Sequence, residues 1–113
     1  MADCIFCKIA AGEIPSACLH DDEYTYAFRD INPEAPVHFL VLPKEHIGSA
    51  NEITAENSAA VARCFEVIAK LAKSEGLSDG YRVINNCGEN GGQTVKNLHF
   101  HVLGGRKMSE QMV

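Results

Sequence analysis

Hydrophobic residues occur in short runs separated by polar turns along most of the chain, and this pattern predicts β-strands. The first two runs flank the acidic stretch 21–23, an arrangement typical of a β-hairpin. The next run is bounded by Pro36 and Pro43, and the last is closed by Gly104 and Gly105. The predicted strands cover residues 18–20, 24–29, 38–42, 81–85 and 95–103.

One long helix is predicted between the third and fourth strands, from about residue 55 to residue 75. Its hydrophobic residues are spaced by three and four positions, so they form one stripe that faces the core. The hydroxyl of Thr54 is the expected N-cap, and Gly76 follows as a stop signal. A short helix is predicted at 4–11, ended by Gly12. The stripe of the long helix consists of Val61, Cys64, Phe65, Ile68, Leu71 and Ala72.

The order of the elements is three strands, the long helix and two more strands, all with short connections. This order predicts an α+β fold with an antiparallel sheet of about five strands. The chain has no internal repeat, low-complexity tract or linker, so residues 1–113 are predicted to form a single domain.

Hydrophobic residues make up 46% of the chain and charged residues 22%, the balance expected of a soluble globular protein. The formal net charge of −5 argues against a general nucleic-acid surface. No apolar run approaches the roughly 20 residues of a membrane helix, and the start of the chain lacks the basic residues of a signal peptide. The five cysteines, an odd number without regular spacing, favour reduced thiols and a cytoplasmic location.

Two histidines lie on alternate positions of the last predicted strand, in the stretch VKNLHFHVLGGR. Alternate residues of a strand share a face, so Asn97, His99 and His101 are expected on one side of the sheet. A pair of partly exposed surface histidines would show the same spacing. The Gly-rich loop 86–93 favours chemistry instead, because glycines let backbone N–H groups approach an anion beside a potentially nucleophilic imidazole.

These segments resemble the histidine-triad (HIT) family, whose signature is His-φ-His-φ-His-φ-φ with φ hydrophobic. The resemblance rests on LHFHVLGGR after NGGQTV, and on CIFCKIAAGEIPS, FRDINPEAPVHFLVLPKEHI and GYRVINNCGENGGQTV in the same order. The GGQ loop and the Gly-Gly-Arg ending are most similar to the Hint branch, the purine nucleoside phosphoramidases. The first signature histidine falls on Asn97, whereas the second and third fall on His99 and His101.

The resemblance implies a HIT-like fold, a homodimer with the long helix and the sheet edges at its interface, and hydrolysis of purine nucleoside phosphoramidates without a catalytic cofactor. His99 would attack the α-phosphorus and expel the amine, and water would then release the nucleoside monophosphate from the nucleotidyl-histidine. The main-chain carbonyl of Asn97 would accept the proton of the second ring nitrogen. His101 and Thr94 would support the phosphate or the leaving group, and His38 would form a hydrogen-bond network with position 97.

The resemblance also implies a nucleotide site around these residues. Asp30 would accept the ribose hydroxyls, and Asn86 with the N–H groups of residues 92–94 would hold phosphate oxygens. Apolar side chains would form the walls of a purine pocket, although core packing is their simpler explanation from the sequence alone. The implied nucleotide-binding residues are Phe6, Ile14, Phe28, Asp30, Ile31, Asn86, Gly92, Gln93, Thr94, His99 and His101.

Asn97 leaves more than one function open. With a neutral amide in the network of His38, we expect retained phosphoramidase activity with an altered pH profile. A dinucleoside polyphosphate hydrolase is a second hypothesis, against which the pair Gly104-Gly105 argues. A third is a purine nucleotide-binding or interaction module whose catalysis is weakened by Asn97.

Cys4 and Cys7 form a C-x-x-C motif, for which a redox role would require a preceding strand that the sequence does not show. Some bacterial members of the HIT family bind a structural zinc ion with such a pair, a further histidine and the first histidine of the triad. His46 is the third candidate ligand here, but the fourth position is Asn97. A zinc site at Cys4, Cys7 and His46 would therefore need a water molecule or the Asn97 amide oxygen as its fourth ligand.

Overall fold

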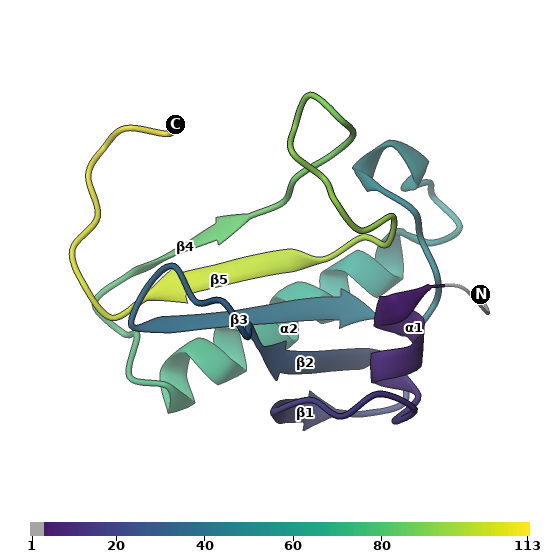
Figure 1. Cartoon of the computed structure of the whole chain (residues 1–113), viewed down its shortest axis with the longest axis horizontal. Coiled ribbons are helices and arrows are strands. Elements are labelled where there is room, and N and C mark those ends of the chain that lie inside the picture. Colours follow the sequence, from purple (N-terminus) through teal and green to yellow (C-terminus); the bar gives the residue numbers. More distant parts are fainter. Residues whose placement is uncertain (1–3) are drawn as a thin grey trace.

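The computed structural model describes residues 4–113, which form one antiparallel sheet flanked by two α-helices (Figure 1). The order of the strands in the sheet is β1-β2-β3-β5-β4, and every pairing is antiparallel. This confirms the predicted α+β fold with a five-stranded antiparallel sheet and one long helix. The strands are β1 (Cys18–Asp21), β2 (Thr25–Arg29), β3 (Val37–Pro43), β4 (Tyr81–Ile84) and β5 (Phe100–Gly104).

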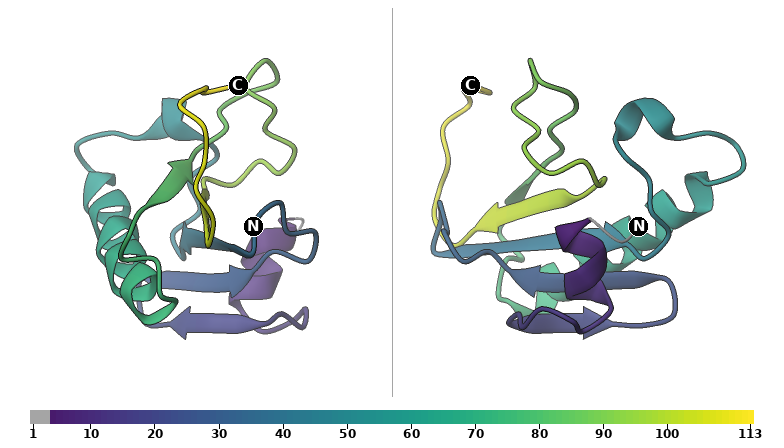
Figure 2. Two further views of the ribbon diagram at one scale, coloured as in Figure 1. Left: turned by 90° about the vertical axis from the view of Figure 1, so that its left-hand side faces the viewer. Right: turned by 45° about the vertical axis from the view of Figure 1, so that its right-hand side comes forward.

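The two helices lie on opposite faces of the sheet, as the left view of Figure 2 shows. The long helix α2 (Ser58–Ser74) packs across β2 and β3, whereas the short helix α1 (Ile5–Ala10) lies over the other face. A 3-10 helix, η1 (Ala50–Glu52), precedes α2. Within residues 4–113, no helix has both the length and the apolar character needed to cross a membrane.

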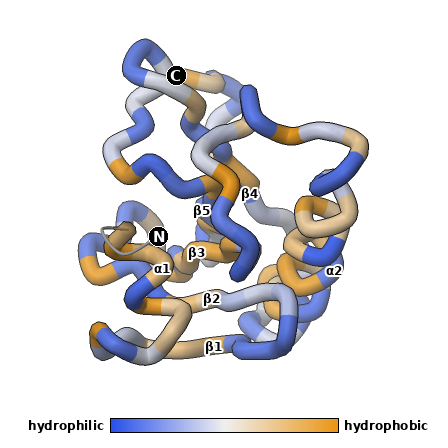
Figure 3. Tube along the Cα trace, turned by 90° about the vertical axis from the view of Figure 1, so that its right-hand side faces the viewer, coloured by the Kyte–Doolittle hydropathy of each residue, from blue (hydrophilic) through white to orange (hydrophobic). Residues whose placement is uncertain are grey.

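The sheet divides the hydrophobic core into two clusters, because alternate residues of each strand face opposite sides. In Figure 3 the strands near α1 are coloured mainly as hydrophobic, and strongly hydrophilic stretches fall in the loops. The cluster between the sheet and α2 is the larger, and it includes Ala27, Phe39, Val41, Ile68, Leu98, Phe100 and Val102. The cluster between the sheet and α1 consists of Phe6, Ile9, Tyr26, Phe28, Leu40 and Leu42.

The long helix begins later than predicted, at Ser58 instead of residue 55. Thr54 is not its N-cap, because the Oγ1 atom of Thr54 accepts the N–H of Glu56 (3.2 Å) within a turn. The Thr54 N–H is in turn donated to the side chain of Asn57 (2.7 Å), which occupies the N-cap position without making a side-chain cap. These local hydrogen bonds compete with the helix and delay its start.

The hydrophobic stripe of α2 also differs from the prediction. Phe65 is 45% exposed rather than buried, and its ring packs edge-on against Phe100 at the margin of the core (centroids 5.1 Å apart). Val61 is only partly buried, and Val67, which the spacing pattern omitted, is buried. The other predicted members are buried: Cys64, Ile68, Leu71 and Ala72.

The last strand is shorter than predicted, since it begins at Phe100 rather than at residue 95. Before it, the Asn97 N–H is donated to the carbonyl of Val95 (2.9 Å) and the Leu98 N–H to the carbonyl of Ile47 (2.6 Å). These bonds replace the sheet ladder over this segment. The predicted division of faces still holds, because Leu98 and Phe100 enter the larger cluster and the residue between them does not.

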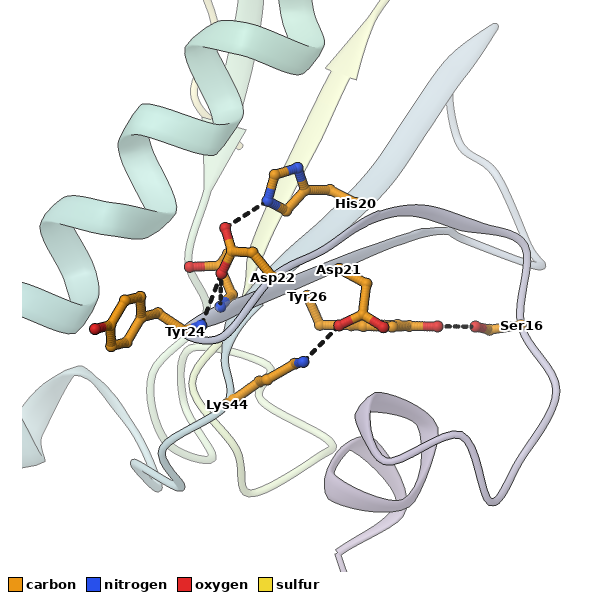
Figure 4. A network of polar contacts seen from close by, with 8 residues as sticks. Ser16, His20, Asp21, Asp22, Tyr24, Tyr26 and Lys44 are labelled. Carbon is orange, nitrogen blue, oxygen red and sulfur yellow. Dashed lines mark hydrogen bonds and ion pairs between the residues drawn. The ribbon is translucent and has the colours of Figure 1, made fainter.

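The hairpin between β1 and β2 is closed by Asp22, whose carboxylate accepts the N–H groups of Tyr24 (2.7 Å) and Thr25 (2.8 Å). The same carboxylate contacts the ring of His20 (2.6 Å), as Figure 4 shows. The hydrogen bond with His20 lowers the pKa of the Asp22 carboxyl to about 2. His20, in β1, thus contacts the carboxylate that closes this turn.

Candidate active site

Two of the predicted site histidines meet because β3 and β5 are neighbours in the sheet. In the register, Leu40 lies opposite His101 and His38 lies opposite Leu103, which makes His38 and His101 diagonal neighbours on one face. The Nε2 atom of His38 is 2.9 Å from the Nδ1 atom of His101. The ring of His99 lies beside that of His101, with centroids 5.1 Å apart.

His99 is held both by its ring and by its main chain. Its Nδ1 atom lies 2.7 Å from the main-chain carbonyl oxygen of Asn97. A carbonyl only accepts, so Nδ1 carries the proton and the neutral ring keeps its lone pair on Nε2. The ring of Phe6 packs edge-on against the imidazole (centroids 4.8 Å apart), and Asn85 donates to the His99 carbonyl (3.0 Å).

A second chain of hydrogen bonds fixes the proton of His101. The main-chain N–H of Glu34 is donated to His38 Nδ1 (3.1 Å), so the neutral ring of His38 carries its proton on Nε2. That proton is donated to His101 Nδ1, which leaves the proton of His101 on its own Nε2. The two adjacent imidazoles therefore take opposite roles, since His99 offers a lone pair and His101 offers an N–H group.

Burial favours the neutral form of both imidazoles. Desolvation lowers the pKa of His99, against the opposing effects of its hydrogen bond to Asn97 and of the Asp30 carboxylate. Desolvation also lowers the pKa of His101, together with repulsion from His99 and His38 and against the attraction of Asp30. Because only the neutral imidazole has a free lone pair, this environment favours a nucleophile at neutral pH.

Asp30, the predicted acceptor for ribose hydroxyls, follows β2 and adjoins the histidines. Its Oδ2 atom lies 3.4 Å from His38 Nε2 and 3.9 Å from His101 Nδ1. Its Oδ1 atom accepts the main-chain N–H of Asn32 (2.8 Å), which fixes the orientation of the carboxylate. The carboxylate therefore lies nearest the protonated Nε2 atom of His38, at its contact with His101.

The main chain of the Gly-rich loop is engaged by its own hydrogen bonds. The N–H of Gly92 is donated to the carbonyl of Glu89 (3.0 Å), and that of Gln93 to the carbonyl of Gly88 (3.0 Å). These two N–H groups are among those expected to hold phosphate. Phosphate could bind to them only if these hydrogen bonds to carbonyls were broken and replaced by hydrogen bonds to phosphate oxygens. The side chain of Thr94, by contrast, is exposed at the end of the loop.

The predicted side chains of this loop also hold its shape. Gln93 accepts the N–H of Gly88 (2.9 Å) and donates to the carbonyl of Gly48 (2.8 Å), and so it ties the loop to the segment after β3. Asn86 donates to the carbonyl of Gly91 (2.7 Å). Gly91 itself leaves no room for a side chain, because a Cβ atom there would lie 2.4 Å from the carbonyl oxygen of Cys87.

The four apolar residues predicted to wall a purine pocket are not equivalent in the structure. Phe6 and Phe28 are buried in the smaller core cluster and contact each other edge to face (centroids 5.7 Å apart). Ile14 is partly buried against the same cluster. Ile31 is 89% exposed and is therefore the member with the most surface left for a ligand.

The predicted metal ligands come together beside the active site. Cys4 is the N-cap of α1 and its sulfur accepts the N–H of Cys7 (3.3 Å), while the Cys7 sulfur lies 3.2 Å from His46 Nδ1. The three ligand atoms all lie within 4.8 Å of one another. Burial raises the pKa of the Cys4 thiol, but hydrogen bonds from Cys7 and Asn97 outweigh it, so the pKa is lowered overall. A thiolate is the form that binds a metal.

Asn97 completes this cluster with its side chain. The Nδ2 atom lies 3.3 Å from the sulfur of Cys4 and 3.5 Å from that of Cys7. The Oδ1 atom is buried without a hydrogen-bond partner, an arrangement that costs about 1–3 kcal/mol. Two sulfurs, one imidazole and one amide oxygen without a hydrogen-bond partner fit a zinc-type ion.

The predicted hydrogen-bond network between His38 and position 97 is wrong. His38 contacts His101 and Asp30, whereas the amide of Asn97 contacts the two sulfurs. The expectation that Asn97 changes the pH profile through His38 therefore loses its structural basis. The hydrogen bond from the Glu34 N–H to His38 was not predicted, because a pattern of side chains gives no signal for a main-chain donor.

Comparison with known proteins identifies the relatives of this chain. The family model for the HIT domain matches residues 11–108. The purine nucleoside phosphoramidase of Escherichia coli K12 is 44% identical over 109 residues, which cover 96% of this chain and 92% of that protein. A HIT family hydrolase from Clostridium thermocellum has a TM-score of 0.97 and 43% identity, covering 100% of this chain and 99% of its own. A histidine triad nucleotide-binding protein from Candida albicans has a TM-score of 0.81 and 34% identity. The match covers 98% of this chain and 87% of the Candida albicans chain.

Proposed function

Because this chain belongs to the HIT domain family, we propose that it hydrolyses purine nucleoside 5′-phosphoramidates through a covalent intermediate on His99. The observation that carries this proposal is the opposite proton placement on two adjacent rings. His99 has its proton on Nδ1, toward the carbonyl of Asn97, and His101 has its proton on Nε2. A lone pair beside an N–H group suits attack on a phosphorus atom whose oxygen must be held.

The reaction divides into two displacements at phosphorus. In the first, the Nε2 lone pair of His99 forms a bond to the α-phosphorus, the P–N bond of the substrate breaks, and the departing nitrogen takes up a proton and leaves as the amine. In the second, a water oxygen bonds to phosphorus, loses a proton, and displaces His99 with its lone pair restored. The proton released by water balances the one taken by the amine, and the products are the nucleoside monophosphate and the amine.

The neighbouring residues take supporting roles in this proposal. The Nε2–H group of His101 donates to a phosphoryl oxygen and stabilises the charge that develops on it. Asp30 accepts hydroxyl groups of the ribose, and the exposed hydroxyl of Thr94 donates to the phosphate or to the leaving group. A zinc-type ion, where present, would be held by Cys4, Cys7 and His46, and it would cross-link α1 to the loop after β3.

Release of adenosine monophosphate from an adenosine phosphoramidate tests the proposal, with His99→Ala as the decisive variant. His20→Ala is the matched control, because His20 is also a hydrogen-bonded histidine but lies in β1 and contacts Asp22 of the β1–β2 turn. We expect turnover by the unaltered protein and by His20→Ala, and loss of at least about 1,000-fold in kcat/KM for His99→Ala.

The other outcomes are equally informative. Turnover that survives His99→Ala would contradict the assignment of the nucleophile. Preferred cleavage of dinucleoside polyphosphates in a direct competition would replace the substrate class while keeping the site. Binding of adenosine monophosphate without turnover would favour a nucleotide-binding module.

A further inference from the structure

We propose that the side-chain oxygen of Asn97 is the fourth ligand of a divalent metal site formed with Cys4, Cys7 and His46. In this proposal the amide of Asn97 has two orientations, with Nδ2 toward the sulfurs when the metal is absent and Oδ1 toward the metal when it is bound. The proposal concerns a structural site and does not depend on the hydrolase activity.

Three spacings among the four side chains are close to the edges of a tetrahedron around such an ion. With ligand atoms about 2.0–2.3 Å from zinc, neighbouring ligand atoms of a tetrahedral site lie about 3.3–3.8 Å apart. The Cys7 sulfur is 3.2 Å from His46 Nδ1, and the Asn97 amide is 3.3 Å and 3.5 Å from the sulfurs of Cys4 and Cys7. The amide thus occupies the place of a fourth ligand and needs little movement to become one.

The hydrogen bonds of Asn97 point to the change of orientation. The side chain is fully buried (0% exposed), and with Nδ2 facing the sulfurs its Oδ1 atom has no partner. Turning the amide over brings Oδ1 to the sulfurs, where two acceptors would repel it unless a cation lies between them. A bound cation would therefore both permit the turn and give the unpartnered oxygen a partner.

The donor set predicts the kind of ion and the strength of binding. Two thiolates and an imidazole suit zinc-type ions, while a neutral amide oxygen is a weaker fourth ligand than a histidine for such ions. We therefore expect a site that binds one ion and that responds measurably to the residue at position 97.

Titration of the reduced, metal-free full chain with Co²⁺ tests the proposal, because visible absorption reports thiolate ligation and coordination number directly. The unaltered protein should bind one Co²⁺ with a four-coordinate spectrum. Asn97→Ala should weaken binding at least tenfold and change the spectrum, whereas Asn97→Asp, which offers an anionic oxygen, should retain or tighten binding. Cys18→Ser is the matched control, since Cys18 is an exposed cysteine on β1 and should leave the titration unchanged.

Two results would overturn the proposal. One is an absence of Co²⁺ and Zn²⁺ binding by the unaltered protein. The other is an identical affinity and spectrum for the unaltered protein and Asn97→Ala, which would assign the fourth position to water.

Asn97 is buried, so its replacement by alanine can also prevent folding. Nuclear magnetic resonance of the unaltered protein then decides, through the signals of the Asn97 carboxamide group with and without Zn²⁺. Coordination through Oδ1 should shift the side-chain carbonyl carbon and alter both amide protons. Unchanged signals at full zinc occupancy would refute the proposed ligand.

Discussion

The two faces of the sheet are built from alternating residues of the same strands, yet they serve different purposes. The face toward α2 is packed with hydrophobic side chains such as Phe39, Val102 and the neighbouring Leu98. The face toward α1 combines a smaller hydrophobic cluster with buried polar residues, among them His38 and His99. Leu98 and His99 are consecutive, yet one belongs to the core and the other to the candidate site.

Polar side chains are buried on the face toward α1 where their hydrogen bonds are made. Burying a polar side chain is costly unless its hydrogen bonds are made, and the imidazoles of His38, His99 and His101 are each bonded to the main chain or to another imidazole. The face toward α2 carries the larger of the two hydrophobic clusters. The face toward α2 therefore mainly stabilises the sheet. The face toward α1 holds the imidazoles in fixed positions, which determines where their protons lie.

Replacement of His99 gives the largest effect that we expect on activity. His99→Ala should lower kcat/KM by at least about 1,000-fold while it lowers the free energy of unfolding less than a large core substitution does. Phosphoramidate turnover and urea unfolding of the same preparation measure both quantities. A loss of activity that follows only from unfolding would erase the distinction between the two faces.

Replacement of Phe39 tests the opposite face. Phe39→Ala removes a fully buried ring and should lower the free energy of unfolding by about 3–5 kcal/mol. At a temperature where the variant remains folded, its turnover per folded molecule should stay close to that of the unaltered protein. A large fall in turnover at full folding would show that the two faces are not separable.

The buried histidines should also set the pH dependence of activity and stability. The pKa values of His99 and His101 are lowered from the ordinary 6.5 by burial, so kcat/KM should remain high as pH falls through 6.5 and decline only below it. The unfolded chain takes up protons on these residues near pH 6.5, before the folded chain does, so stability should decrease as pH falls from 6.5 through the lower folded pKa values. Rate profiles and urea midpoints check this, and a rate midpoint above 6.5 would contradict it.

The smallest effect concerns an ion pair at the edge of the larger cluster. Arg29, at the end of β2, makes a two-pronged contact with Glu75 after α2 (2.7 Å and 3.1 Å). Because the Arg29 side chain is 45% exposed and its charge is screened by solvent, Glu75→Gln should cost only about 0–1 kcal/mol, and high salt should reduce the difference. Urea unfolding at low and high salt tests this, and a salt-independent loss of several kcal/mol would refute it.

Much of the fold could be predicted because its signals are local. Period-two runs and turn residues indicated the hairpin, the strands and the separate faces of Leu98 and His99. The hydrogen bond from the His99 ring to the carbonyl of Asn97, which the resemblance to the HIT family implied, is also present.

The parts that could not be predicted depend on register or on local competition. The contact between His38 and His101 arises from the pairing of β3 with β5, which neither strand specifies alone. The late start of α2 comes from side-chain hydrogen bonds of Thr54 and Asn57, which favour a turn over the helix that the hydrophobic pattern suggests. The approach of Asn97 to the cysteines likewise requires the fold.

The proton arrangement of the site depends on two peptide groups, the carbonyl of Asn97 and the N–H of Glu34. An alanine scan would leave both groups in place and would report position 34 as silent. Semisynthesis would reveal them, since an ester in place of the amide at Glu34 removes the N–H and frees His38 to adopt its other tautomer. The proton pattern therefore depends on the path of the backbone at positions 34 and 97, whereas the side chain of Asn97 serves the separate cluster with Cys4 and Cys7.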